Sequence, residues 1–272
     1  MPSPSISYRY PQTLAWAFAF AAWSGHNGAM KRLSLLVLLW LLPVGTGPLG
    51  ASAGGAKGAA MTTTTTQDQR NRQVLQAAEN GDLEQLQTLL RAGASANAAD
   101  STGRTALTWA AKGDHVAVAR ALIAAGAKPD PQDNGRSNAL LVTGETGSVA
   151  MLREVLKANP DLTRTNRFGG TALIPAADRG HLAYVREILR TTDIDVNHVN
   201  NLGWTALLEA VILGDGGPTH TEIVRELLAH GADRQIADRE GVTPLQHARQ
   251  RGYAAMTTLL EDGASQSQED QR

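Results

Sequence analysis

Apolar and polar positions alternate along the chain in a pattern that predicts short amphipathic helices arranged in pairs. The segment 100–132 shows it most clearly. Its apolar positions are Leu107, Ala110 and Ala111, and then Val118, Leu122 and Ile123. Each set falls on one face of a helix, because residues three and four apart in sequence share a face. The pattern predicts a first helix over 106–113 and a second over 116–125.

The same pattern recurs along most of the chain. The equivalents of Thr105 are Arg72, Thr105, Asn138, Thr171, Thr205 and Thr243, with spacings of 33, 33, 33, 34 and 38 residues. A fixed period in this range is typical of stacked units that share one continuous core. The sequence therefore predicts one elongated all-α domain.

Polar residues and glycines punctuate each unit. Thr102, Gly103 and Arg104 predict a turn, with Gly103 free to take a positive φ. Thr105 is placed to cap the helix that follows it, since its hydroxyl can accept from an N–H two or three residues later. Gly126 is expected to end the second helix in the left-handed conformation.

These signatures resemble the ankyrin repeat. The turn reads GRTAL at 103–107, GGTAL at 169–173, GWTAL at 203–207 and GVTPL at 241–245, and Gly-Ala endings stand at 93–94, 126–127, 231–232 and 263–264. The resemblance implies an all-α ankyrin-repeat solenoid of stacked helix pairs with hairpin-like loops, covering 70–264. Its repeats are expected at 70–99, 100–132, 133–165, 166–199, 200–237 and 238–264.

Two repeats depart from the pattern. In the fourth, Pro175 lies inside the first helix, which is tolerated only near a helix start where N–H groups are unpaired. The fifth repeat has extra residues between its two helices, in the glycine-rich insert GDGGPTH at 214–220. Insertions in repeat arrays map to loops and often to a binding face.

The N-terminal segment has the pattern of a targeting sequence. A basic stretch at 30–32 precedes an apolar run over 33–42, and Ala51 and Ala53 supply the small residues of a cleavage site. We expect Met30 to be the true start, 1–29 to be an over-extended N-terminus, and 30–53 to be a signal peptide cleaved near Ala53. A membrane anchor extending to Leu49 is the alternative. A flexible linker is expected over 54–69, and a polar tail over 265–272.

Composition narrows the function. The 25 basic and 26 acidic residues give a net charge of −1, which offers no basic face for nucleic acid. The chain has no cysteine, so thiol nucleophiles and cysteine-type metal sites are absent. No motif supplies a catalytic set, so we expect a non-enzymatic protein without metal or cofactor. His115 and His181 share one turn position and are interpreted as structural, whereas His198 and His220 leave open a metal site near the insert.

Ankyrin proteins commonly bind partners with their hairpin tips and the inner face of their first helices. On the matching positions here, the resemblance implies the protein-binding candidates Arg104, Lys112, Arg167, Phe168, Asp178, Arg179, Asn201, Trp204 and Asp215. Trp204 stands at an exposed hairpin position, and it either anchors a partner or packs on Phe168 or Val199. Trp109 is expected to pack within or between repeats.

The sequence thus predicts a monomeric, exported protein-binding module, a periplasmic scaffold or a modulator of a partner protein, with no stable membrane anchor. Two alternatives remain at this point. One is a metal- or small-molecule-binding protein that uses the 214–220 insert. The other is a secreted effector that binds a host protein.

Overall fold

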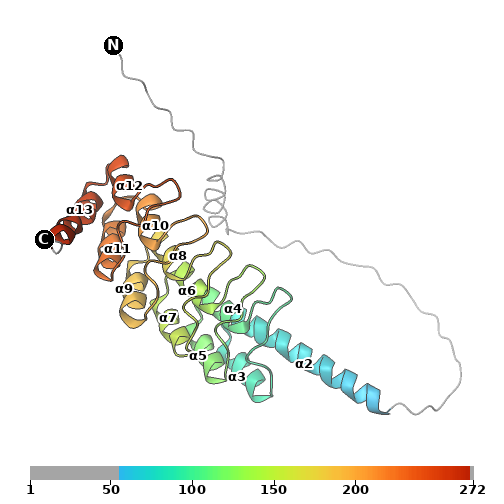
Figure 1. Ribbon diagram of the computed structural model, residues 1–272. Helices are drawn as coiled ribbons and strands as arrows, with labels where there is room; N and C mark the ends of the chain where they lie inside the picture. The colour runs from blue at the N-terminus through green and yellow to red at the C-terminus, as the bar shows by residue number, and fades with distance from the viewer. Residues whose placement is uncertain (1–54, 270–272) are drawn as a thin grey trace, which may run out of the picture. The chain divides into compact units, whose positions relative to one another are not determined.

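The computed structural model describes residues 55–269, and these form six consecutive helix pairs (Figure 1). The pairs are α2 (Gly55–Asn80) with α3 (Leu83–Arg91), α4 (Ala106–Lys112) with α5 (Val116–Ala124), α6 (Ala139–Thr146) with α7 (Val149–Leu156), α8 (Leu173–Asp178) with α9 (Leu182–Thr191), α10 (Ala206–Ile212) with α11 (Pro218–Ala229), and α12 (Pro244–Gln250) with α13 (Ala254–Glu269). β-pairing in the described residues is limited to one isolated bridge, between Ala99 and Thr105. The predicted all-α solenoid is therefore confirmed.

The helices stack in two rows. The first helices α4, α6, α8, α10 and α12 lie side by side in one row, and α5, α7, α9 and α11 form a second row alongside it (Figure 1). Small residues allow close approach within the first row. At Gly144 of α6, a Cβ atom would stand 2.1 Å from the Ala172 carbonyl oxygen at the start of the next first helix. Any larger residue there would force the two repeats apart.

Polar caps begin the first helices as the sequence predicts, with one exception. Thr105 and Thr205 each accept a hydrogen bond from an N–H three residues on, at 3.2 Å in both cases, and Asn138 does the same at 2.9 Å. In the fourth repeat, α8 begins one residue later, and its N-cap Ala172 has no capping side chain. The buried Thr171 hydroxyl finds no hydrogen-bond partner in the described structure.

One continuous apolar core runs through the stack. The first helices contribute buried alanines and leucines, such as Ala110 and Leu207, and the second helices contribute larger side chains such as Leu122 and Ile188. Tyr184 is fully buried and its hydroxyl lies 2.8 Å from the Thr143 hydroxyl of the neighbouring repeat. Each repeat therefore depends on its neighbours for burial, as a solenoid requires.

A ladder of ion pairs joins successive second helices. Each pair reaches from one repeat to the next: Arg120–Glu154 at 2.8 Å, Arg153–Glu187 at 2.8 Å and Arg186–Glu226 at 2.6 Å. Hydrogen bonds from Arg153 and Arg190 lower the pKa of Glu187 to about 2. The arginine ends are largely exposed, so solvent screens the attraction within each pair. The ladder fixes the register between repeats more than it stabilises them.

The two ends of the described chain differ from expectation. Over 55–69, where the sequence predicts a flexible linker, the structure has the first part of α2, which runs into the first repeat. Ala56, Ala59 and Ala60 favour helix and no proline interrupts the stretch. At the other end, α13 continues to Glu269, so most of the predicted tail is helical. The expected over-extended N-terminus (1–29) and signal peptide (30–53) lie outside the described residues. No described helix is long and apolar enough to span a membrane.

Candidate functional site

Each hairpin between repeats is built on one Asx residue. In the fifth repeat, the Asn200 side-chain oxygen accepts from the backbone N–H groups of Leu202 and Trp204, at 2.9 and 3.0 Å. Asp100 and Asn166 make the same two bonds in their own hairpins. This geometry places the residue two positions after the Asx residue at the hairpin tip. The tip residues are Thr102, Gly135, Phe168, Leu202 and Glu240.

Exposed large apolar side chains gather in the fourth and fifth repeats. Among the described residues they are Phe168, Val199, Leu202 and Leu213, with 50, 46, 49 and 40 % of their surface exposed. Phe168 and Leu202 occupy adjacent hairpin tips, and Val199 precedes the second of these hairpins. We call Phe168, Val199 and Leu202 the apolar hairpin edge. Exposed apolar side chains on adjacent hairpins make this edge a candidate interaction surface.

The two hairpins of this edge are held together by Asn201. Its backbone N–H donates to the Phe168 carbonyl at 2.9 Å, and its side-chain nitrogen lies 3.4 Å from the Arg167 carbonyl oxygen. A Cβ atom at Gly169 would stand 2.4 Å from the Asn201 side-chain oxygen, so only glycine fits there. The Arg167 guanidinium lies 4.7 Å from the Phe168 ring centroid. The structure thus brings three predicted binding residues together.

Trp204 is half-buried. It follows Asn200 by four residues, which places it at the foot of the hairpin, while Leu202 occupies the tip. Both readings of Trp204, as a partner anchor and as packing on Phe168 or Val199, therefore stay predictions. The signal for the true tip residue was present in the sequence, because Leu202 aligns with the polar or small residues Thr102, Gly135 and Glu240 of other repeats.

Two further candidates, Arg104 and Lys112, are engaged with Trp109 instead. The Trp109 indole N–H donates to Asp100 at 3.1 Å, and the Arg104 guanidinium lies 4.6 Å from its ring centroid. The Lys112 ammonium lies 5.2 Å from the same centroid. Arg104 also pairs with the buried carboxylate of Asp133 at 2.9 Å. These contacts show a structural use for both cations, and Trp109 packs against the core as predicted.

Two other repeats have a different side chain at the position of Trp109, but that side chain still contacts the Asx residue of its own hairpin. Glu209 accepts from the Asn200 side-chain nitrogen at 2.7 Å, and His247 lies 2.7 Å from Asp238. Burial raises the pKa of Glu209 to about 8, and the nearby Asp178 carboxylate adds to the effect. Glu209 is therefore largely protonated at neutral pH, a feature that its spacing in the sequence did not reveal.

Asp178, Arg179 and Asp215 lie apart from the hairpins, at the opposite ends of the first helices. Asp178 ends α8, and burial raises the pKa of its carboxyl group. Arg179 donates to the Glu145 carbonyl of the preceding repeat at 2.9 Å. Asp215 belongs to the insert and is 77 % exposed. The candidates predicted from the sequence therefore divide between two edges of the first-helix row.

The turn histidines have structural partners, as predicted. His115 and His181 each place Nε2 beside a backbone carbonyl of the preceding repeat, at 3.0 and 3.2 Å. His198 lies 2.7 Å from the Gly169 carbonyl oxygen and His220 lies 3.0 Å from the Asp178 carbonyl oxygen, so the two engage different places. Within the described residues, no group of three or more His, Asp or Glu side chains is arranged to hold a metal ion.

The insert is fastened on both sides. The Tyr253 hydroxyl of the sixth repeat donates to the Gly214 carbonyl at 3.1 Å. A Cβ atom at Gly216, which has a φ of 71°, would stand 2.3 Å from the Tyr253 ring. Asp215 accepts from the Gly217 N–H and contacts His220, at 2.9 Å each. The glycines therefore serve close packing in addition to turning the chain.

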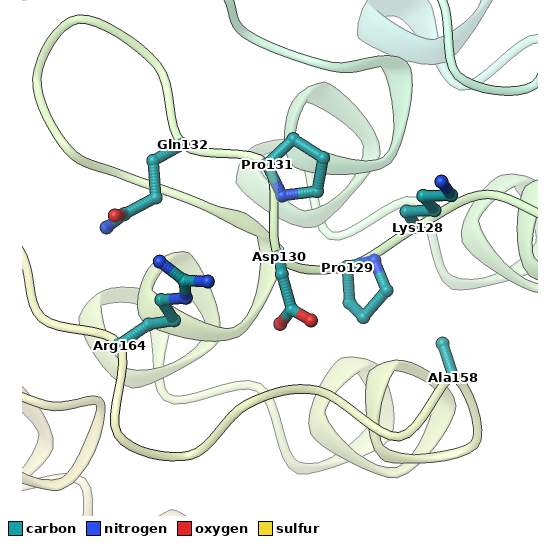
Figure 2. A pocket seen from close by; sticks show the side chains of 7 residues that line it. All are labelled: Lys128, Pro129, Asp130, Pro131, Gln132, Ala158 and Arg164. Atoms are coloured by element: carbon teal, nitrogen blue, oxygen red, sulfur yellow. The ribbon is translucent and has the colours of Figure 1, made fainter.

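One hollow of about 580 Å³ lies away from these residues, between the links that follow α5 and α7 (Figure 2). Its lining residues are Lys128, Pro129, Asp130, Pro131, Gln132, Ala158 and Arg164. Several of its polar groups are already used within the loops. Asp130 accepts from the Asp161 N–H at 2.8 Å, and the Gln132 side chain donates to the Thr165 carbonyl at 2.8 Å. We assign it no ligand.

Stacked helix pairs, Asx-based hairpins and back-reaching turn histidines define a repeat protein, and comparison with known proteins gives its family. The family model for ankyrin repeats matches three times, over residues 74–166, 140–233 and 195–270. The chain belongs to the ankyrin-repeat family. Ankyrin repeats are generally protein–protein interaction modules and typically non-catalytic.

Individual relatives agree with this assignment. The chain is similar to the putative ankyrin repeat protein YahD of Escherichia coli K12, 49 % identical over 69 residues, which is 25 % of this chain and 34 % of YahD. It resembles the crystal structure of an ankyrin repeat domain from Acinetobacter baumannii, with a TM-score of 0.68 and 45 % identity over 70 % of this chain and 97 % of the other. EF0377, an ankyrin repeat protein, gives a TM-score of 0.67 and 35 % identity over 70 and 96 %. The match to YahD thus spans about a third of that relative.

Proposed function

We propose that this protein binds a partner protein through the apolar hairpin edge of its fourth and fifth repeats. The observation that carries the proposal is the clustering of Phe168, Val199 and Leu202, each about half exposed, on two adjacent hairpins. Burying such side chains against a partner is favourable by roughly 25 cal/mol per Å² of apolar surface. Asn201 joins the two hairpins and makes the edge a preformed surface.

The partner's side of the contact follows from the residues beside the edge. Arg167 stacks on Phe168, and Trp204 lies half-buried at the foot of the next hairpin. Contact with these apolar tips would favour an aliphatic or aromatic side chain of the partner. Aromatic and arginine residues commonly dominate binding energy at such places.

We further propose that the protein works after export, in the periplasm or outside the cell, as a scaffold or modulator of its partner. The basic, apolar and small-residue segments at 30–53 support this proposal. Sequencing the N-terminus of exported protein tests it, and the expected first residue is Gly54. Exported material that retains residues before Met30 would contradict the proposed start, and protein confined to the cytoplasm would contradict export.

The binding surface is tested by photo-crosslinking from single hairpin tips in cells that express the full chain from Met30. A crosslinkable residue replaces Thr102, Phe168, Leu202 or Glu240 in turn, since these occupy equivalent positions. The expected result is one dominant adduct from positions 168 and 202 and none from positions 102 and 240. Equal adducts from all four tips, or adducts from 102 or 240 alone, would rule out the proposed surface.

A further inference from the structure

Three histidines of this chain reach back to the same place in the preceding repeat. His115 contacts the Glu79 carbonyl, His181 the Glu145 carbonyl and His220 the Asp178 carbonyl, at 3.0, 3.2 and 3.0 Å between Nε2 and O. The three carbonyls are equivalent, because each lies at the end of a first helix. His220 keeps this contact although the insert moves it 42 residues from its acceptor, compared with 36 for the other two.

His220 differs from the other two at its second ring nitrogen. Its Nδ1 lies 2.9 Å from Oδ1 of Asp215, whereas the contacts of His115 and His181 involve Nε2. Both nitrogens of His220 therefore face oxygen acceptors, one a carbonyl and the other a carboxylate. A neutral imidazole carries one N–H, and only the protonated ring can donate to both acceptors at once.

Other charged and titratable groups surround this contact. On α8, the Asp178 carboxylate interacts electrostatically with the His220 ring. It interacts in the same way with Arg179 and His181. From the sixth repeat, Tyr253 packs against the insert and donates to Gly214. The hydrogen bonds from the Gly217 N–H and from His220 keep the pKa of Asp215 below its usual value. Asp215 therefore stays ionised through the range in which a histidine titrates.

We propose that His220 is a protonation-dependent latch that fastens the 214–220 insert of the fifth repeat to the fourth repeat. In the protonated state, the ring bridges Asp215 of the insert and the carbonyl that ends α8. When the ring loses a proton, one of its nitrogens can no longer donate and faces an oxygen that can only accept. The bond to Asp215 is then lost, because this exposed carboxylate can turn to water. The bond to Asp178 remains, as it does for His115 and His181.

The latch does not depend on the proposed binding function. The insert follows the C-terminal end of α10, whereas the apolar hairpin edge precedes the start of α8 and α10. A test of the insert itself therefore stands whether or not the hairpin edge binds a partner.

Hydrogen exchange of the insert amides across the histidine titration range tests the latch on the full chain. The Gly217 amide, which donates to Asp215 at 2.9 Å, is the reporter, after correction for the intrinsic pH dependence of exchange. We expect its protection to fall about threefold as the pH rises, which is the scale of one exposed ion pair. His181→Gln should leave this step unchanged, because His181 contacts a carbonyl and not the insert.

Two variants decide the assignment. His220→Gln should abolish the step, since no titrating ring remains. Asp215→Asn should abolish it as well, and this exposed residue is replaced without disturbing the core. Ring-nitrogen NMR should show two N–H groups on His220 below the step and one above it. A step that survives in either variant, or a wild type without any step, would overturn the proposal.

Discussion

The second and fifth repeats share a backbone plan and use their tryptophans in opposite ways. Both hairpins rest on an Asx residue, Asp100 or Asn200, and both first helices begin at a capping threonine with the same 3.2 Å bond. In the second repeat, Trp109 lies on the first helix, and Asp100, Arg104 and Lys112 surround it. In the fifth, Trp204 lies on the hairpin beside exposed apolar residues.

This difference separates structural from recognition roles within one fold. The helix position that holds Trp109 in the second repeat holds the buried Glu209 in the fifth. The tip that holds Thr102 in the second repeat holds Leu202 in the fifth. The fifth repeat therefore exposes an apolar side chain at the tip where the second repeat has a polar one. We infer that the two repeats differ in role although they have the same architecture.

The largest expected effect tests what the two repeats share. Leu107 and Leu207 occupy equivalent core positions, each 1 % exposed or less. Leu107→Ala and Leu207→Ala should each lower the free energy of unfolding by about 2–5 kcal/mol. Chemical denaturation measures both. A loss below about 1 kcal/mol in either variant would show that this leucine is not part of a core that stabilises the stacked repeats.

The next effect tests where the repeats differ. Trp109→Ala should lower the free energy of unfolding by about 2–3 kcal/mol, because it removes core packing, the bond to Asp100 and two cation contacts. Trp204→Ala should cost less than about 1 kcal/mol, since its side chain is not part of the core. Thermal melts of the two variants provide the comparison, and equal losses would remove the distinction between the repeats.

A pH-dependent effect is expected at Glu209. Its pKa is about 8 in the folded protein and 4.5 in the reference state, so the folded chain holds a proton that the unfolded chain releases. Stability should therefore fall as the pH rises from about 4.5 to about 8 and level off above. Glu209→Gln imitates the protonated acid and should remove this fall, so that the variant is more stable than the wild type at pH 8. Parallel pH profiles of wild type and variant would contradict the assignment.

Local signals made much of the fold predictable from the sequence. The repeat period predicted the stacked helix pairs. Thr105 and Thr205 marked the starts of two first helices, and Gly126 has the expected positive φ, 85°. The expected cap at Thr171 fails because α8 begins one residue later. That shift depends on packing between repeats, which no local pattern records.

The candidate site was harder to predict because it depends on contacts between distant residues. Arg104 and Lys112 were predicted to bind a partner, and the structure places both cations against the Trp109 ring. The glycine-rich insert suggests flexibility, but Tyr253, 39 residues after Gly214, fastens it. The sequence analysis singled out Trp204 and not Leu202, which the Asx geometry places at the hairpin tip. Aligning the tip positions of all repeats would have found Leu202.

The central claim is that the apolar hairpin edge of the fourth and fifth repeats binds the partner, and an affinity comparison tests it most directly. The partner captured at positions 168 and 202 is titrated, in isolation, against wild-type protein, Leu202→Ser and the matched tip variant Thr102→Ala. Losing a buried apolar anchor should weaken binding by about tenfold or more in Leu202→Ser, with wild-type affinity in Thr102→Ala and unchanged stability in both. Equal affinities for all three proteins would contradict the account.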